Sequence, residues 1–132
     1  MRFIIYGPGG VGGTIAARLH LGGAEVLLIG RGDHARAIQS RGLRFVAPEG
    51  ERLLRIPTVQ DPGEVAWRAT DMVLLAMKSQ HTAAALDDLV AAAPEDIGVV
   101  CGQNGVANER MALRRFANSP QDTLRFMGVF ST

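Results

Sequence analysis

A glycine-rich stretch near the amino terminus constrains the fold of this chain more than any other feature. The stretch reads Gly7-Pro8-Gly9-Gly10-Val11-Gly12-Gly13, with an apolar run at residues 3–6 before it and helical spacing of apolar residues after it, through residue 21. An apolar strand, a tight turn and a helix form the setting in which Gly-x-Gly-x-x-Gly binds a dinucleotide. The pattern therefore predicts a nucleotide-binding βα unit. A glycine-rich turn without a ligand is the alternative.

Each glycine of the pattern has a separate physical role. Gly7 permits the sharp turn out of the strand, Gly9 lets the backbone approach a diphosphate, and Gly12 lets the helix lie close to the strand. The first N–H groups of the helix have no partner within the helix and are available to an anion. The predicted coenzyme-binding residues of this loop are Gly7, Pro8, Gly9, Gly10, Val11 and Gly12.

Composition limits the possible classes of protein. The 132 residues suffice for one domain, and 47% of them are hydrophobic, which indicates a packed core. The formal net charge of +1 gives no sign of a nucleic-acid or membrane surface, and the single cysteine, Cys101, excludes an internal disulfide. The run at residues 3–6 is too short for a signal peptide, and no stretch reaches the ~18–20 apolar residues of a membrane span. We expect a soluble cytoplasmic protein.

Apolar runs alternate with helical patterns along most of the chain. Strands are predicted at residues 3–6, 25–29, 72–77, 97–101 and 124–130. Helices are predicted at residues 14–21, 33–40 with Asp33 as cap, 79–92 with Ser79 as cap, and 106–116. Residues 43–47 and 52–59 read as a hairpin that interrupts the alternation, followed by a short helix at 64–69. This order predicts an α/β Rossmann-type fold, a doubly wound and mostly parallel sheet with a β-hairpin insertion.

Arg31 follows the second predicted strand, where NAD-binding folds carry an acidic residue for the ribose hydroxyls. An arginine near this position accommodates the 2′-phosphate of NADP instead. One charge-assisted hydrogen bond corresponds to about a 10- to 100-fold preference for NADP over NAD. The alternative is an arginine in a solvated loop. Asp33 remains a second candidate for the ribose, although its position favours a helix cap.

Two polar residues follow the next two predicted strands. Lys78, the only lysine among 14 basic residues, comes directly after residues 72–77, and Asn104 comes shortly after residues 97–101. Both fall at the carboxyl ends of parallel strands, where ligands bind in such sheets. Together they could hold a nicotinamide ribose and a substrate carboxylate. The alternatives are an exposed charge for Lys78 and turn chemistry for Asn104.

The remaining polar side chains are weaker candidates for a site. Gln80 and Gln103 flank the two stronger candidates, and His81 lies in the first turn of a predicted helix. His20 and His34 read as surface residues, and Cys101 as a buried and inert thiol. No group of residues has the spacing of metal ligands.

The chain resembles the amino-terminal domain of the ketopantoate reductase (2-dehydropantoate 2-reductase) family. The matching stretches are the glycine loop, Leu28-Ile29-Gly30-Arg31, residues 71–80 and Gln103-Asn104-Gly105-Val106. The resemblance implies NADPH-dependent reduction of a 2-keto acid to a 2-hydroxy acid on the route to pantothenate. It also implies that Arg31 meets the adenosine 2′-phosphate, while Lys78, Gln103 and Asn104 lie at the nicotinamide and substrate end.

Members of that family continue into a helical carboxyl-terminal domain, which supplies the lysine that protonates the substrate oxygen. This sequence ends at Thr132, so we expect residues 1–132 to be an NADP-binding domain that is inactive alone. Apolar residues near its end suggest a homodimer as one possibility. Two other readings remain open: a non-catalytic NADP(H)-binding sensor module, and another Rossmann hydroxyacid dehydrogenase.

Overall fold

Strand β1 (Arg2–Tyr6) is the strand around which the other elements are arranged. The structure is a computed structural model, and it describes residues 1–95, 97–101 and 126–127. β1 pairs in parallel with β2 (Glu25–Ile29) on one side and with β6 (Met72–Leu75) on the other. The chain thus builds outward from β1 in one direction and then returns to build in the other.

The main sheet has six parallel strands in the order β5-β2-β1-β6-β7-β8. The three outer strands are β5 (Thr58–Val59), β7 (Gly98–Cys101) and β8 (Phe126–Met127). Because the order reverses between β1 and β6, a crevice is expected at their carboxyl ends, where doubly wound folds bind ligands. The predicted Rossmann-type fold is confirmed.

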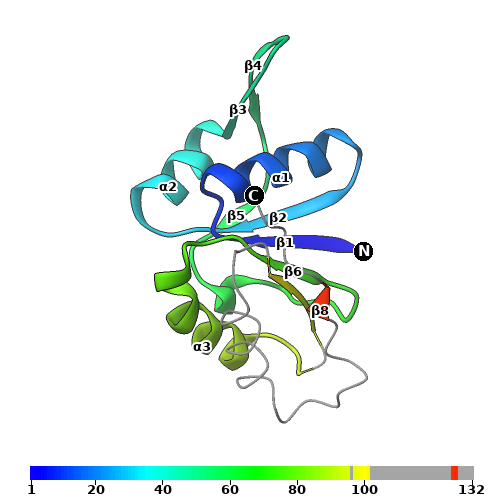
Figure 1. Cartoon of the computed structure of the whole chain (residues 1–132), viewed down its shortest axis with the longest axis vertical. Helices are drawn as coiled ribbons and strands as arrows, with labels where there is room; N and C mark the ends of the chain where they lie inside the picture. The colour runs from blue at the N-terminus through cyan, green and yellow to red at the C-terminus, as the bar shows by residue number, and fades with distance from the viewer. Residues whose placement is uncertain (96, 102–125, 128–132) are drawn as a thin grey trace.

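Helices cover both faces of the sheet (Figure 1). α1 (Gly10–Leu21) and α2 (Gly32–Arg41) lie on one face, and α3 (Thr82–Ala92) lies on the other. Side chains of β1 alternate between them: Ile5 packs with the α1 and α2 side, and Tyr6 with the α3 side. This two-sided burial explains why the strands read as continuous apolar runs.

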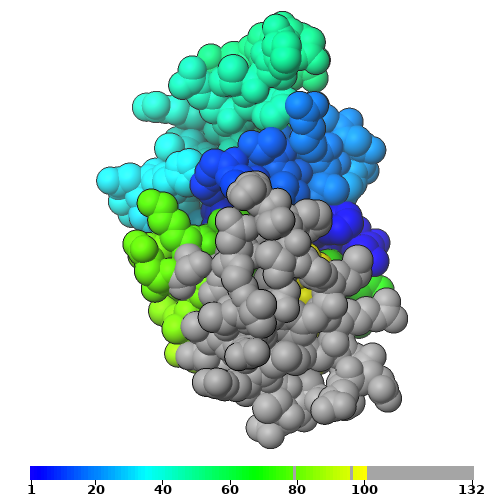
Figure 2. Space-filling model, in the orientation of Figure 1, coloured from blue at the N-terminus to red at the C-terminus, as the bar shows by residue number. Residues whose placement is uncertain are grey.

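The hairpin is confirmed, but its second strand is shorter than predicted. β3 (Leu43–Ala47) pairs antiparallel with β4 (Gly50–Leu54), and the hairpin projects beyond α1 and α2 (Figures 1 and 2). The predicted strand 52–59 is wrong as a single element, because its last residues form β5 in the main sheet. Pro57 has no N–H to donate to a ladder, and its carbonyl accepts instead from the backbone N–H of Leu28 at 2.9 Å.

Three local predictions between the strands are also wrong. In place of a helix at residues 64–69 there is a short 3-10 helix, η1 (Pro62–Glu64), in which the Asp61 carboxylate accepts from the backbone N–H of Gly63 at 2.7 Å. α2 begins before Asp33, whose carboxylate lies in the first turn, where the helix dipole favours an acid without a capping bond. A 3-10 turn, η2 (Ser79–His81), precedes α3, so the N-cap position of α3 is His81 and not the predicted Ser79.

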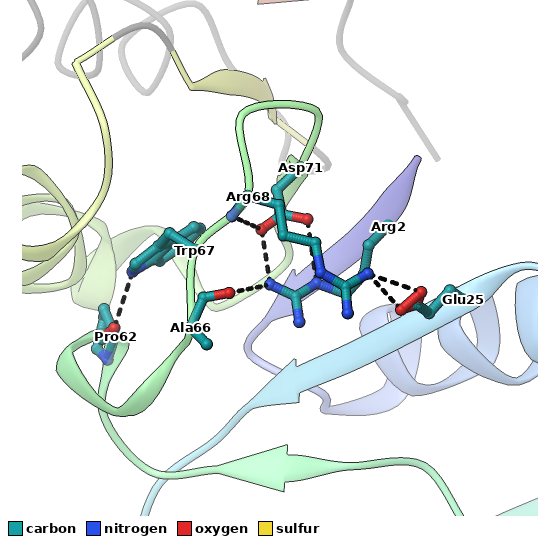
Figure 3. A network of polar contacts seen from close by, with 7 residues as sticks. All are labelled: Arg2, Glu25, Pro62, Ala66, Trp67, Arg68 and Asp71. Carbon is teal, nitrogen blue, oxygen red and sulfur yellow. Dashed lines mark hydrogen bonds and ion pairs between the residues drawn. The ribbon is translucent and has the colours of Figure 1, made fainter.

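Arginine side chains join the amino ends of three neighbouring strands (Figure 3). Arg2 of β1 donates two hydrogen bonds, of 3.0 and 2.7 Å, to the carboxylate of Asp71 just before β6. Both side chains are buried, with 8% and 0% exposed. At the surface beside them, Arg68 forms an ion pair with Glu25 of β2 at 2.5 Å. The two pairs connect β1 and β2 to the segment before β6, at the edge of the sheet opposite the glycine loop.

No helix within the described residues is long and apolar enough to cross a membrane.

Candidate functional site

The glycine loop lies at the carboxyl end of β1, at the point where the strand order reverses. The backbone N–H of Gly7 donates to the Ile29 carbonyl of β2 at 2.9 Å, and the Tyr6 carbonyl accepts from Ala76 N–H, after β6, at 2.8 Å. Gly7 has a positive φ of 91°, and a Cβ there would lie 2.7 Å from the backbone nitrogen of Met77. The turn is therefore clamped between two neighbouring strand ends and requires glycine.

Gly12 has the packing role that the pattern predicts. A Cβ at this position would lie 2.4 Å from the Gly7 carbonyl oxygen and 2.8 Å from the Cβ of Ala76. Helix α1 can approach the strand ends this closely only because residue 12 has no side chain.

Gly9 and Gly10 differ from these two glycines. Apart from their chain neighbours and the backbone of α1 itself, no described residue has an atom within 4 Å of a Cβ built at either position, and neither glycine has a positive φ. Gly9 is the N-cap of α1, and no side chain caps the helix there. Packing within the described part of the chain thus does not explain the two glycines. The loop leaves open space in front of the N-terminal amides of α1, where an anion is favoured.

The other residues of the loop also have defined positions. Pro8 is buried, and its ring would contact a Cβ at Gly30, at the end of β2, at 3.2 Å. The Pro8 carbonyl lies 2.9 Å from Nε2 of His34, which donates to it when the proton is on that nitrogen. Val11 is half exposed. His34 is exposed, as predicted, and contacts the loop from α2.

Arg31 lies at the same edge, two residues after β2 ends at Ile29, and its guanidinium points toward the α3 side of the sheet. It lies 2.6 Å from the carboxylate of Asp88 on α3 and donates to the Tyr6 hydroxyl at 3.4 Å. Burial raises the pKa of Tyr6, while the hydrogen bond from Arg31 and the guanidinium charge act in the opposite direction. Neither Tyr6 nor Asp88 was predicted from the sequence to be part of the site.

The pKa of Arg31 is raised, first by its hydrogen bond to Tyr6 and further by the charge of Asp88. The guanidinium therefore remains a fixed positive charge. The side chains of Arg31 and Asp88 are 58% and 45% exposed, so both are accessible to a ligand.

Lys78 lies three residues after β6 ends at Leu75 and next to Met77, whose backbone lies close to Gly7. It is exposed, and no ion pair joins it to any other residue that the structure describes. Gln80 and His81 are exposed in η2. Gln103 and Asn104, and the predicted helix at 106–116, lie outside the described residues. The described part of the chain thus brings the glycine loop, Arg31 and the backbone of Lys78 to one edge.

No group of three or more His, Cys, Asp and Glu side chains that could hold a metal ion occurs in the described part of the chain.

Comparison with known proteins gives consistent matches. The sequence model of the ketopantoate reductase PanE/ApbA family matches residues 3–129. A 2-dehydropantoate 2-reductase of Mesorhizobium japonicum is 34% identical over 107 residues, which are 80% of this chain and 32% of the relative. That of Lactococcus lactis is 34% identical over 111 residues, 83% of this chain and 35% of the relative. The chain spans about a third of the length of these relatives.

Solved structures with the same fold include members of more than one enzyme group. D-mandelate dehydrogenase in a ternary complex with NADH and anilino(oxo)acetate superposes with a TM-score of 0.80 at 28% identity, covering 96% of this chain and 40% of that one. A PanE/ApbA family ketopantoate reductase from Ralstonia eutropha superposes with a TM-score of 0.75 at 28% identity. The match covers 98% of this chain and 40% of that one.

Proposed function

Because this chain belongs to the ketopantoate reductase PanE/ApbA family, we propose that it forms the NADPH-binding part of a reductase that converts a 2-keto acid to a 2-hydroxy acid. 2-Dehydropantoate, on the route to pantothenate, is the proposed substrate, since the relatives at 34% identity carry that activity in their names. Reduction is an activity of the whole enzyme, whereas coenzyme binding is a property that this chain can be tested for directly.

The open space at Gly9 and Gly10 is the observation that carries the proposal. Gly7 and Gly12 are needed to build the turn, but none of the residues that the structure describes excludes a side chain at Gly9 or Gly10. A diphosphate fits this arrangement, because it is an anion that needs backbone N–H donors and close backbone approach. The loop also lies at the reversal of the strand order, where doubly wound sheets bind nucleotides.

The other residues have proposed roles around the same edge. The bound coenzyme supplies the hydride. Arg31 binds the 2′-phosphate through its guanidinium, which matches phosphate geometry and keeps its charge. Lys78 offers a compact positive charge to the nicotinamide ribose and the substrate carboxylate, and Gln103 and Asn104 add amide groups at that end.

A single methyl group at Gly9 tests the diphosphate site. We expect Gly9→Ala to weaken binding of both NADPH and NADH by about tenfold or more, because the methyl group fills the space that the diphosphate needs. Titration followed by coenzyme fluorescence measures this effect. Thermal unfolding provides the control: the Gly9 variant should stay folded, whereas Gly12→Ala should be clearly destabilised by its contact with the Gly7 carbonyl. Unchanged coenzyme affinity in Gly9→Ala would contradict the proposal.

The NADP preference is tested by a matched pair of arginine variants. Arg31→Ala should weaken NADPH binding about 10- to 100-fold and leave NADH binding nearly unchanged, because only NADPH has the 2′-phosphate. Arg36→Ala removes the same charge from α2, at a side chain that pairs with Asp33, and should change neither affinity. Equal loss of both coenzymes in Arg31→Ala would remove the 2′-phosphate assignment.

A second candidate is an NADH-dependent hydroxyacid dehydrogenase. Two observations favour it: D-mandelate dehydrogenase, solved with NADH, has the same fold, and Arg31 already has a carboxylate partner in Asp88. Tighter binding of NADH than of NADPH by the unmodified chain would support this candidate over the first.

A further inference from the structure

We infer that Asp88 is a specificity-determining residue of the coenzyme site, which competes with the 2′-phosphate for Arg31 and so reduces the preference for NADPH. The inference rests on the proposed function, since it concerns the coenzyme that Arg31 selects. It starts from the contact between Arg31 and Asp88, which no feature of the sequence around either residue indicates.

The position of Asp88 makes this competition direct. Asp88 is on α3, on the opposite face of the sheet from α1 and α2, and its carboxylate reaches the guanidinium of Arg31 at 2.6 Å. Tyr6 contacts the same guanidinium from the end of β1. Arg31 is thus held between two elements, at the end of β2, rather than extending alone into solvent.

Charge decides how this arrangement treats the two coenzymes. A 2′-phosphate that binds Arg31 must either displace the Asp88 carboxylate or lie beside it. Displacement breaks the existing ion pair, and a position beside the carboxylate brings two negative charges together, so both weaken the binding of NADPH. A ribose 2′-hydroxyl carries no charge and can donate a hydrogen bond to a carboxylate. Many NAD-binding folds place an acid at the end of the second strand for this purpose. Here the strand ends without an acid, and α3 brings a carboxylate to the same guanidinium.

The affinity ratio of NADPH to NADH in Asp88→Asn tests the inference. We expect the ratio to rise about three- to tenfold, mostly through tighter binding of NADPH, since the pair is exposed and partly screened by solvent. In an Arg31→Ala background the same substitution should raise the ratio less, because only the direct repulsion between the carboxylate and the phosphate then remains. Asp88→Ala serves as a second neutral variant and should raise the ratio in the same way.

Glu51→Gln is the matched control, because it removes an exposed carboxylate that pairs with a different arginine, Arg44 of the hairpin. It should leave the ratio unchanged. An unchanged or lower ratio in Asp88→Asn, or an equal rise with and without Arg31, would overturn the inference while leaving coenzyme binding intact. Failure of the unmodified chain to bind either coenzyme would instead overturn the proposed function, and this inference with it.

Discussion

Tyr6 is the residue in which the core and the candidate site meet. It is the only tyrosine of the chain, and it is buried at the end of β1 with 2% of its surface exposed. Its ring belongs to the core on the α3 side, while its hydroxyl contacts Arg31. Burial disfavours the phenolate and raises the pKa of Tyr6, and the nearby guanidinium only partly opposes this shift.

Ionisation of Tyr6 should therefore destabilise the folded chain at alkaline pH. The folded state holds the Tyr6 proton more tightly than the unfolded state does. The stability that protonated Tyr6 contributes is therefore fully present below the ordinary tyrosine pKa of about 10. It is lost as the pH rises through the higher pKa of the folded state. We expect Tyr6→Phe to lose less unfolding free energy over this pH range than the unmodified chain, in denaturant titrations at several pH values.

The ultraviolet absorbance of tyrosinate follows the ionisation of Tyr6 directly, because no other tyrosine contributes. Arg31→Ala should raise the midpoint further, since the guanidinium lowers the pKa. A midpoint at the ordinary tyrosine value in the folded chain would show that the hydroxyl is not held as described.

At this scale the sequence predicted residue types but not their partners. The positions of Arg31 and the glycines at the carboxyl edge could be predicted, because a residue that directly follows a strand lies at the edge where that strand ends. Asp88 and His34 could not, because their contacts with Arg31 and Pro8 span 57 and 26 residues and depend on how the helices pack. The coenzyme-binding roles of the glycine loop and Arg31, like the roles of Lys78, Gln103 and Asn104, remain predictions.

Among the elements, β1 is held at both of its ends by different means. At its carboxyl end, Tyr6 accepts from the residue that follows β6, and Gly7, the next residue of the chain, donates to the last residue of β2. At its amino end, a buried arginine is hydrogen-bonded both to Asp71 and, at 3.0 Å, to the Ala66 carbonyl (Figure 3). Asp71 also accepts from the backbone N–H of Arg68 at 2.9 Å, so the carboxylate organises the loop before β6 as well.

Breaking this buried pair should cost far more stability than breaking the exposed pair beside it. We expect Asp71→Asn to lower the unfolding free energy by about 3 kcal/mol or more, because the charge of Arg2 would remain buried without its counter-charge. Glu25→Gln disrupts the pair with Arg68, whose side chains are 52% and 56% exposed, and should cost less than about 1 kcal/mol. Urea denaturation measures both. Similar losses in the two variants would contradict the assignment of stability to the buried pair.

The elements themselves were predicted well where burial on both faces produced a continuous apolar run, as in β1, β2 and β6. Boundaries were missed where a backbone detail decided them. Pro57 separates β4 from β5, and the 3-10 turns η1 and η2 replace helical turns that periodicity alone favoured. Such details depend on individual hydrogen bonds, which hydrophobic spacing does not record.

In the whole molecule, a stabilising ion pair and the candidate site lie at opposite edges of one sheet. The amino edge contains the buried ion pair, and the carboxyl edge contains the open glycine loop with Arg31 and the start of the segment that carries Lys78. This separation follows from the parallel strand order, because every βα connection of a parallel sheet leaves from the same edge. Alternation of strands and helices in the sequence was sufficient to predict that Arg31 and Lys78 follow strands at the carboxyl edge, but it did not predict the ion pair at the amino edge.

The central claim is that the coenzyme binds at the glycine loop, and backbone amide NMR during titration with NADPH tests it most directly. We expect the amide signals of Gly9, Gly10, Val11 and Gly12 to shift most, together with that of Arg31, while signals at the amino edge, such as that of Asp71, stay in place. Saturable shifts that cluster elsewhere, with the glycine loop unaffected, would contradict the account.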